Sequence, residues 1–382
     1  LGHIMSSSAS MLCLRTLRKA RFDLKRAVYL HSREKIAISR FFSSGDDLGS
    51  SSNFAFDRRI KVLQRNGAAR LKKSNNSDED AVDYDYFHRE IAYRLVDRLD
   101  DIRRDEGFPL ALDLGAGPGL IRRAICSDDA FDGVGGIGGV RKLVQLDSSE
   151  GMLHRDDDIA VEGEERCGTF QLVADEESTF PFPDGTFDLV ISSTAMHWVN
   201  DLPGVFREVK RVLKPDGCFI FAMVGGATIP ELRSSLVLAE LERDGGVSPH
   251  VGPFVDFTDV GTILTSAGFT LPTVDIDTIK FAYPNGMVLM EHLQRMGEGN
   301  ACLNRRSSMS VDTFLAAAAI YDEMFQLETD AGFEKDSIEA SVQVIYAIGW
   351  SPHESQQKPA RRGSATHKVG EMITHTKGEG SS

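Results

Sequence analysis

Ala111-Leu112-Asp113-Leu114-Gly115-Ala116-Gly117-Pro118-Gly119 is the stretch that decides the fold of this 382-residue chain. An apolar run that contains one carboxylate ends in three glycines at alternate positions, and a helix can open from Ile121 onward. A strand that leads into a glycine-rich turn and a helix brings backbone N–H groups close to a ligand. Glycine is needed where φ is positive or where a side chain would block that approach. The spacing is G-x-G-x-G, which differs from the dinucleotide-binding G-x-G-x-x-G.

Strand-like and helix-like segments alternate around this loop. Strands are predicted at 110–114, 142–147, 170–174, 187–192 and 218–224, with a helix at 205–213 and a turn at 214–217. Further helices are predicted at 86–99, 258–267, 287–295 and 311–325, and further strands at 274–281 and 342–348. This alternation predicts an α/β fold whose parallel sheet is covered by helices on both faces. Ligands of such sheets bind at the carboxyl ends of the strands.

Two carboxylates stand at those strand ends. Asp147 ends the second predicted strand, where it can accept both ribose hydroxyls of a nucleoside. Its separation from the glycine loop exceeds the usual ~20 residues, which the glycine-rich insert 132–139 explains. Asp175 follows the third strand, where a short acceptor can take an adenine amino group. A strand-end cap is the competing structural interpretation of Asp147.

Two further motifs make the pattern specific. They are Phe180-Pro181-Phe182-Pro183-Asp184-Gly185-Thr186-Phe187-Asp188-Leu189-Val190 and Leu213-Lys214-Pro215-Asp216-Gly217. With the glycine loop they resemble the class I methyltransferases, whose Rossmann-like sheet is mostly parallel with an antiparallel edge. The resemblance implies S-adenosylmethionine as cofactor. It implies that the cofactor-binding residues are Asp113, Gly115, Gly117, Gly119, Asp147 and Asp175.

Met196-His197-Trp198 lies just past the fourth predicted strand, at the mouth of the expected pocket. His197 can act as a base or orient a substrate, and Trp198 can stack on a cofactor or a guanidinium. Both are candidates for the catalytic site, although packing against the pocket wall explains them equally well. His154-Arg155-Asp156 has the H-x-D spacing of an iron site but sits in a charged, helix-like segment, so no metal is predicted. The chain has no G-x-S-x-G motif that would indicate a hydrolase.

The amino-acid composition and the net charge argue against several classes of function. The net charge of −14 argues against general nucleic-acid binding. No window has the roughly 18 uninterrupted apolar residues of a membrane span. The cysteines show no C-x-x-C pair and fit a reducing compartment. They are Cys13, Cys126, Cys167, Cys218 and Cys302.

The ends of the chain differ from its centre. Residues 1–44 carry nine basic residues against Asp23 and Glu34, and they resemble a mitochondrial transit peptide. The predicted organisation then comprises a linker and basic segment at 45–82, a methyltransferase-like domain at 83–285, and a C-terminal helical extension at 286–367 that packs on it. The tail 368–382 is expected to be disordered.

Markers outside the methyltransferase pattern place the chain more narrowly. They include His197-Trp198-Val199-Asn200-Asp201-Leu202-Pro203, Leu293-Gln294-Arg295-Met296-Gly297-Glu298-Gly299-Asn300 and Ile348-Gly349-Trp350. From about Phe54 to Thr366 the chain resembles the mitochondrial arginine hydroxylases that assemble respiratory complex I, the fifth assembly factor of NADH dehydrogenase. It is more distantly similar to bacterial malonyl-carrier-protein O-methyltransferases.

This resemblance implies a protein on the matrix side of the mitochondrial inner membrane, peripherally associated with it. It implies hydroxylation of an arginine on the complex I iron–sulfur subunit near the quinone site, with that subunit and other assembly factors as partners. Asp175, His197 and Trp198 are expected to suit a guanidinium, but no residue that activates oxygen can be named. A methyltransferase acting on a protein or a carrier-bound carboxylate, and a non-catalytic assembly chaperone, are the alternatives.

Overall fold

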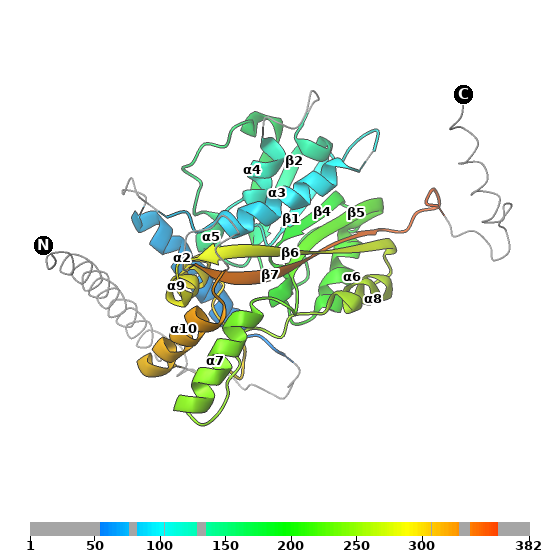
Figure 1. Ribbon diagram of the computed structural model, residues 1–382. Coiled ribbons are helices and arrows are strands. Elements are labelled where there is room, and N and C mark those ends of the chain that lie inside the picture. The colour runs from blue at the N-terminus through cyan, green and yellow to red at the C-terminus, as the bar shows by residue number, and fades with distance from the viewer. Residues whose placement is uncertain are drawn as a thin grey trace, which may run out of the picture. The chain divides into compact units, whose positions relative to one another are not determined.

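A seven-stranded sheet in the order β3-β2-β1-β4-β5-β7-β6 forms the centre of the molecule (Figure 1). The computed structural model describes residues 54–75, 82–102, 104–127, 135–306, 308–327 and 337–357. The expected transit peptide at 1–44 and the tail at 368–382 lie outside this range, as does part of the expected linker at 45–82.

Five strands run parallel: β1 (Leu110–Leu114), β2 (Lys142–Asp147), β3 (Gly168–Val173), β4 (Phe187–Ser193) and β5 (Leu213–Val224). In the centre, Leu112 of β1 pairs with Val144 of β2 and Val190 of β4. Apolar runs of this kind suit strands that are covered on both faces. The α/β class I methyltransferase fold predicted from the sequence is confirmed, including its antiparallel edge.

That edge consists of β6 (Thr270–Tyr283) and β7 (Ile338–Trp350). β7 runs antiparallel to both neighbours and lies between β5 and β6. The segment 286–367 contains the helices α9 (Gly286–Met296) and α10 (Val311–Met324), as expected of a helical extension. It also supplies this interior strand, so it is built into the sheet.

Three local expectations need correction. The turn expected at 214–217 is part of β5, where the pairing shifts register between Phe187 and Leu189 and Asp216 has φ 61°. The helix α2 (Arg58–Asn75) was expected only as a basic segment, because charged side chains and Gly67 obscure its helical pattern. The helix α7 (Pro230–Arg243) was not predicted, because its apolar stripe is weak and interrupted by buried Glu231 and Ser235.

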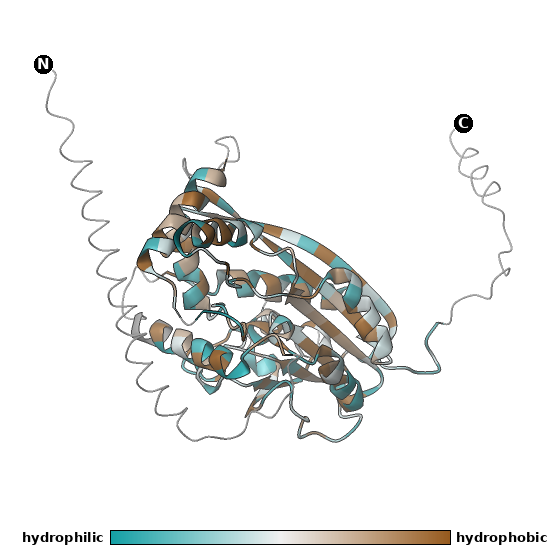
Figure 2. Ribbon diagram, turned by 90° about the horizontal axis from the view of Figure 1, so that it is seen from below, coloured by the Kyte–Doolittle hydropathy of each residue, from teal (hydrophilic) through white to brown (hydrophobic). Residues whose placement is uncertain are grey.

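Two apolar layers cover the sheet. Leu189 and Ile191 of β4 face the layer that includes α3 (Tyr86–Asp100) and α4 (Leu120–Cys126), whereas Val190 faces α6 (Leu202–Val212) and α8 (Phe257–Ser266). The first layer extends to α7, α9 and α10. Figure 2 shows apolar residues concentrated along the sheet and on the helix faces against it. Each fully buried side chain of this size stabilises the fold by about 1.5–3 kcal/mol.

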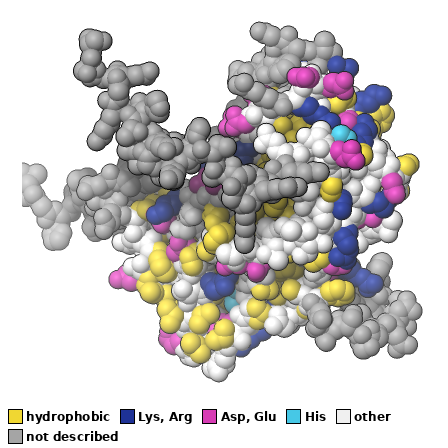
Figure 3. All heavy atoms as spheres, turned by 90° about the vertical axis from the view of Figure 1, so that its right-hand side faces the viewer, with side chains coloured by type: hydrophobic (Ala, Val, Ile, Leu, Met, Phe, Trp, Pro, Cys, Tyr) yellow, Lys and Arg dark blue, Asp and Glu magenta, His cyan; other side chains and the backbone are white. Residues whose placement is uncertain are grey.

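The helix α2 packs against α5 (Glu150–Leu153) and α9, near the ends of β1 and β2 (Figure 1). A segment from the start of the described chain therefore lies over the sheet edge where ligands of this fold bind. On the face drawn in Figure 3, basic and acidic side chains are interspersed with apolar ones. Within the described ranges, no helix combines the length and apolar character that a membrane crossing needs.

Candidate functional site

The glycine loop after β1 has the backbone conformation that the sequence predicts. Gly115, Gly117 and Gly119 have φ of 75°, 54° and 80°, values that favour glycine. A Cβ on Gly115 would lie 2.2 Å from the Cβ of Ala195, so the close approach of two loops also excludes a side chain there. The loop is held by N–H groups of Gly115 and Ala116, which donate to the carbonyl of Leu146.

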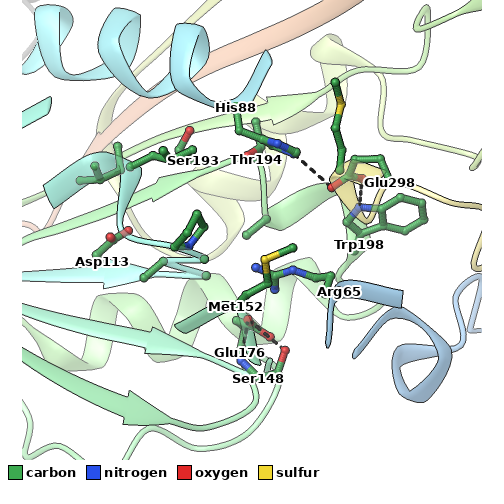
Figure 4. Close-up of a pocket in the computed structure, with 18 of the residues that line it drawn as sticks. Arg65, His88, Asp113, Ser148, Met152, Glu176, Ser193, Thr194, Trp198 and Glu298 are labelled. Carbon is green, nitrogen blue, oxygen red and sulfur yellow. Dashed lines mark hydrogen bonds and ion pairs between the residues drawn. The ribbon is translucent and has the colours of Figure 1, made fainter. Parts of the chain in front are cut away.

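A cleft of about 750 Å³, including space open to solvent, lies beside this loop (Figure 4). Its walls come from the glycine loop, from α2, from the segment after β4, and from the turn after α9. The lining includes Asp113, Gly115, Gly117, Trp198 and Glu298. Three of the predicted cofactor residues and one predicted catalytic candidate therefore share one cleft.

Asp113 is fully buried at the floor of the cleft; its carboxylate oxygens form no hydrogen bond of good geometry within the described residues, although the Gln145 amide on β2 lies close enough to lower its pKa. Burial raises the pKa of Asp113 to about 8, because the charged form loses its hydration. A buried carboxyl group without a partner destabilises the empty protein. The ammonium group of an amino-acid ligand is a partner of the right charge.

Asp147 lies at the carboxyl end of β2, as predicted, and is fully buried. Its oxygens accept the N–H of Gly117 at 2.7 Å and the N–H of Ser149 at 2.7 Å. Arg65 of α2 donates to both oxygens at 2.8 and 2.7 Å. The carboxylate expected to hold ribose hydroxyls therefore carries a guanidinium of the same chain.

The acidic segment after β3 is tied to α2 in the same way. Asp175 is half exposed and accepts from Arg58 at 2.8 Å, and this guanidinium together with the Glu177 N–H lowers the pKa of Asp175 despite its partial burial. Glu176 is buried, lines the cleft and also pairs with Arg58. Burial raises the pKa of Glu176. The structure thus places Glu176, the neighbour of the predicted Asp175, in the cleft wall.

His197 and Trp198 lie together in a short 3-10 turn, Met196–Trp198, and both are buried. Trp198 Nε1 donates to Glu298 Oε2 at 2.7 Å (Figure 4). His197 Nε2 lies 3.6 Å from the same oxygen. His88 of α3 reaches the other oxygen at 3.3 Å. Burial lowers the pKa of His197, so its ring is the neutral form at pH 7. Glu298 thus brings together two distant parts of the sequence, His88 of α3 and the adjacent His197 and Trp198.

A lysine completes this group. Lys61 of α2 has its ammonium 3.3 Å from the Trp198 ring centroid and 3.6 Å from Glu298. Burial lowers the pKa of Lys61 to about 7. Burial alone would raise the pKa of Glu298, but the Lys61 charge and hydrogen bonds with His197 and His88 lower it well below the usual value.

The H-x-D segment has other partners. His154 pairs with Asp157 at 2.9 Å, and Asp156 accepts from Arg155 and Arg123. Across the ranges the structure describes, no three His, Cys, Asp or Glu side chains are grouped as metal ligands would be.

The cleft fits S-adenosylmethionine in two respects. The buried Asp113 suits the ammonium group of the methionine portion, and the N–H groups of the glycine loop border the same cleft. Asp147 stands where ribose hydroxyls are held in this fold. When bound, the cofactor would supply an electrophilic methyl group.

The sequence did not reveal six of the polar residues around the cleft: Arg58, Lys61, Arg65, His88, Glu176 and Glu298. One signal was present. Three of the basic residues of α2, Arg58, Lys61 and Arg65, are spaced i, i+3 and i+7, which places them on one face of a helix. Because their partners follow more than 80 residues later, the pairing itself could not be inferred.

The fold and this cleft define a protein of the class I methyltransferase fold. Residues 112–221 match the family model described as a methyltransferase domain. The chain is 44% identical over 312 residues to "Arginine-hydroxylase NDUFAF5, mitochondrial" of Danio rerio, which covers 81% of this chain and 87% of the relative. The Homo sapiens protein of the same name is 44% identical over 317 residues, or 83% of each chain. The chain belongs to this family of mitochondrial arginine hydroxylases.

A more distant relative is the malonyl-acyl-carrier-protein O-methyltransferase of Methylovorus sp. (strain MP688). It is 29% identical over 292 residues, which cover 74% of this chain and 89% of that protein. The family resemblance predicted from the sequence is therefore confirmed, and so is its more distant methyltransferase branch.

Proposed function

We propose that this protein binds S-adenosylmethionine and hydroxylates an arginine of the complex I iron–sulfur subunit near the quinone site during early assembly. The proposal rests chiefly on the 44% identity to arginine hydroxylases over most of the chain. The cleft supports it, because an aromatic face and a carboxylate, Trp198 and Glu298, stand beside the glycine loop. That pair suits a guanidinium.

Hydroxylation replaces a C–H bond with C–O–H and removes two electrons from the substrate. The oxygen atom and the oxidising equivalents must come from an external donor of the dioxygen class, used with a reductant. The residues of the cleft contribute binding and orientation: Asp113 and Asp147 toward the cofactor, Trp198 and Glu298 toward the cation. We place the protein on the matrix side of the mitochondrial inner membrane, peripherally associated with that membrane and in contact with other assembly factors.

Peptide mass spectrometry of the complex I iron–sulfur subunit tests the proposal, with cells that contain or lack this protein. One added oxygen on an arginine should be present only when the protein is present. A methyl group that depends on the protein would instead support the methyltransferase function of the distant relatives. Defective assembly with an unmodified subunit would indicate a chaperone.

A further inference from the structure

A small cage for a cation lies at the end of the cleft. Trp198 supplies an aromatic face, Glu298 a carboxylate, and the turn after α9 supplies the carbonyl oxygens of Gly297 and Gly299. The Lys61 ammonium donates to these carbonyls at 3.0 and 3.2 Å. We call these four groups the cation cage.

The geometry of the cation cage is fixed by its surroundings. Trp198 Nε1 donates to Glu298, which holds the carboxylate beside the indole ring (Figure 4). Phe56 contacts the same ring edge-to-face with centroids 5.1 Å apart, and Phe254 does so at 5.3 Å. His88 holds the second oxygen of Glu298. Trp198 and Glu298 are therefore held in place by their neighbours, and both line the cleft.

Lys61 is a poor match for the cage that it fills. An ammonium is a compact and strongly hydrated charge, and this one is buried. A guanidinium is planar and weakly hydrated, so it can lie flat on an indole while it donates to a carboxylate and to carbonyls. Burial lowers the pKa of Lys61 to about 7, although the Glu298 charge acts in the opposite direction.

We propose that the cation cage is the seat of the substrate guanidinium and that Lys61 holds this seat until an arginine side chain displaces it. The inference rests on the proposed function and deepens it, because it names Glu298 and Trp198 as the groups that select arginine. Arg58 and Arg65 of the same helix occupy Glu176 and Asp147. Displacement of Lys61 therefore leaves α2 anchored by Arg58, and also by Arg65 as long as no ligand takes Asp147.

Tryptophan fluorescence can test this seat directly, because the chain has only two tryptophans. Trp350 lies in β7, so Trp350→Phe leaves Trp198 as the single reporter. The probes are ethylguanidinium, with ethylurea as the neutral shape control and ethylammonium as the lysine-like control. Ethylguanidinium should change the emission with a saturating curve in full-length protein, and ethylurea should not.

Two substitutions should change the affinity for ethylguanidinium in opposite directions. Lys61→Met removes the resident cation at similar length and should tighten ethylguanidinium binding about tenfold. Glu298→Gln removes the charge and should weaken it at least tenfold. Glu291→Gln is the matched control, since Glu291 lies on α9, is half exposed and pairs only locally with Arg295.

The outcomes separate this inference from the proposed function. The inference would be overturned if ethylguanidinium gave no saturable change in Trp198 fluorescence in the Trp350→Phe protein and none in its Lys61→Met derivative. It would also be overturned if a folded Glu298→Gln variant bound ethylguanidinium with unchanged affinity. Weaker S-adenosylmethionine binding by Lys61→Met, with unchanged ethylguanidinium binding, would assign Lys61 to the cofactor and also overturn it. If Glu298→Gln does not fold, the Lys61→Met titration decides. Guanidinium binding without any modified arginine in the iron–sulfur subunit would leave the seat intact and reject the hydroxylase.

Discussion

At the scale of single residues, Asp147 carries the strongest prediction about the cofactor. Asp147→Asn should weaken binding of S-adenosylhomocysteine at least tenfold, because hydrogen bonds to a charged acceptor contribute about 1.5–3 kcal/mol. Isothermal titration calorimetry measures this directly. Asp184→Asn is the control, since Asp184 is an exposed partner of Arg211 outside the cleft. Equal affinity in both variants would remove Asp147 from the cofactor site.

Asp113 predicts a dependence of stability on pH. The pKa of Asp113 in the folded protein is about 8, above the usual value of about 3.9 for an aspartate, so the folded protein binds more protons than the unfolded chain between these two pH values. The free energy of unfolding should therefore fall as pH rises through this window, by at most about 1.4 kcal/mol per pH unit from this residue.

The substitution Asp113→Asn removes the contribution of Asp113 to the pH dependence of the free energy of unfolding. Urea unfolding between pH 5 and 7.5 should show a flatter slope for this variant than for the native protein, because asparagine stays neutral throughout. Identical slopes would mean that Asp113 is solvated or paired in solution.

The residue scale also shows what the sequence could and could not reveal about the site. The glycines and Asp147 were predictable because strand, turn and carboxylate follow one another in the chain. Glu298 was not, because it meets Trp198 across 100 residues and through the packing of α9. Contacts made by tertiary packing leave no local pattern.

At the scale of elements, α2 is the part of the structure most closely linked to ligand binding. Arg65 occupies both oxygens of Asp147, so under the proposed function the ribose hydroxyls would have to compete with this guanidinium for the same acceptors. Arg65→Met should therefore tighten binding of S-adenosylhomocysteine, by up to about tenfold or 1.4 kcal/mol. Calorimetry again provides the measurement.

Arg59→Gln is the control for this prediction, because it neutralises one charge on the exposed side of the same helix. Weaker binding in Arg65→Met would show instead that Arg65 contacts the cofactor.

The sequence predicts those helices and strands best whose hydrophobic residues form a clear periodic pattern or an unbroken apolar run. The bounds of β1 and β2 are those predicted, since each is a short apolar run between turn residues. The helix α2 was missed because its stability comes from ion pairs and from packing on α5 and α9. The bulge in β5 was read as a turn because Lys214-Pro215-Asp216-Gly217 has turn composition in either setting.

At the scale of the whole molecule, a bound cofactor should stabilise the fold. A ligand that binds only the folded state at 100 times its dissociation constant adds about 2.7 kcal/mol. S-adenosylhomocysteine should therefore raise the melting temperature by several degrees in differential scanning fluorimetry. ATP at the same concentration is the control nucleotide, and an equal shift with ATP would argue against a site selective for the methionine portion.

The position of β7 sets the order in which the protein can be completed. Among the strands that the structure describes, β6 pairs only with β7, and β7 is also the neighbour of β5. During synthesis, β6 cannot pair along its full length until β7 has left the ribosome, up to residue 350. The glycine loop is synthesised more than 200 residues earlier. A premature stop just before Ile338 would remove one strand from the sequence, but it would take two from the sheet and leave β5 as an open edge. Synthesis of β7 is therefore needed to complete the sheet, and a chain that lacks β7 would expose strand edges to quality-control proteases.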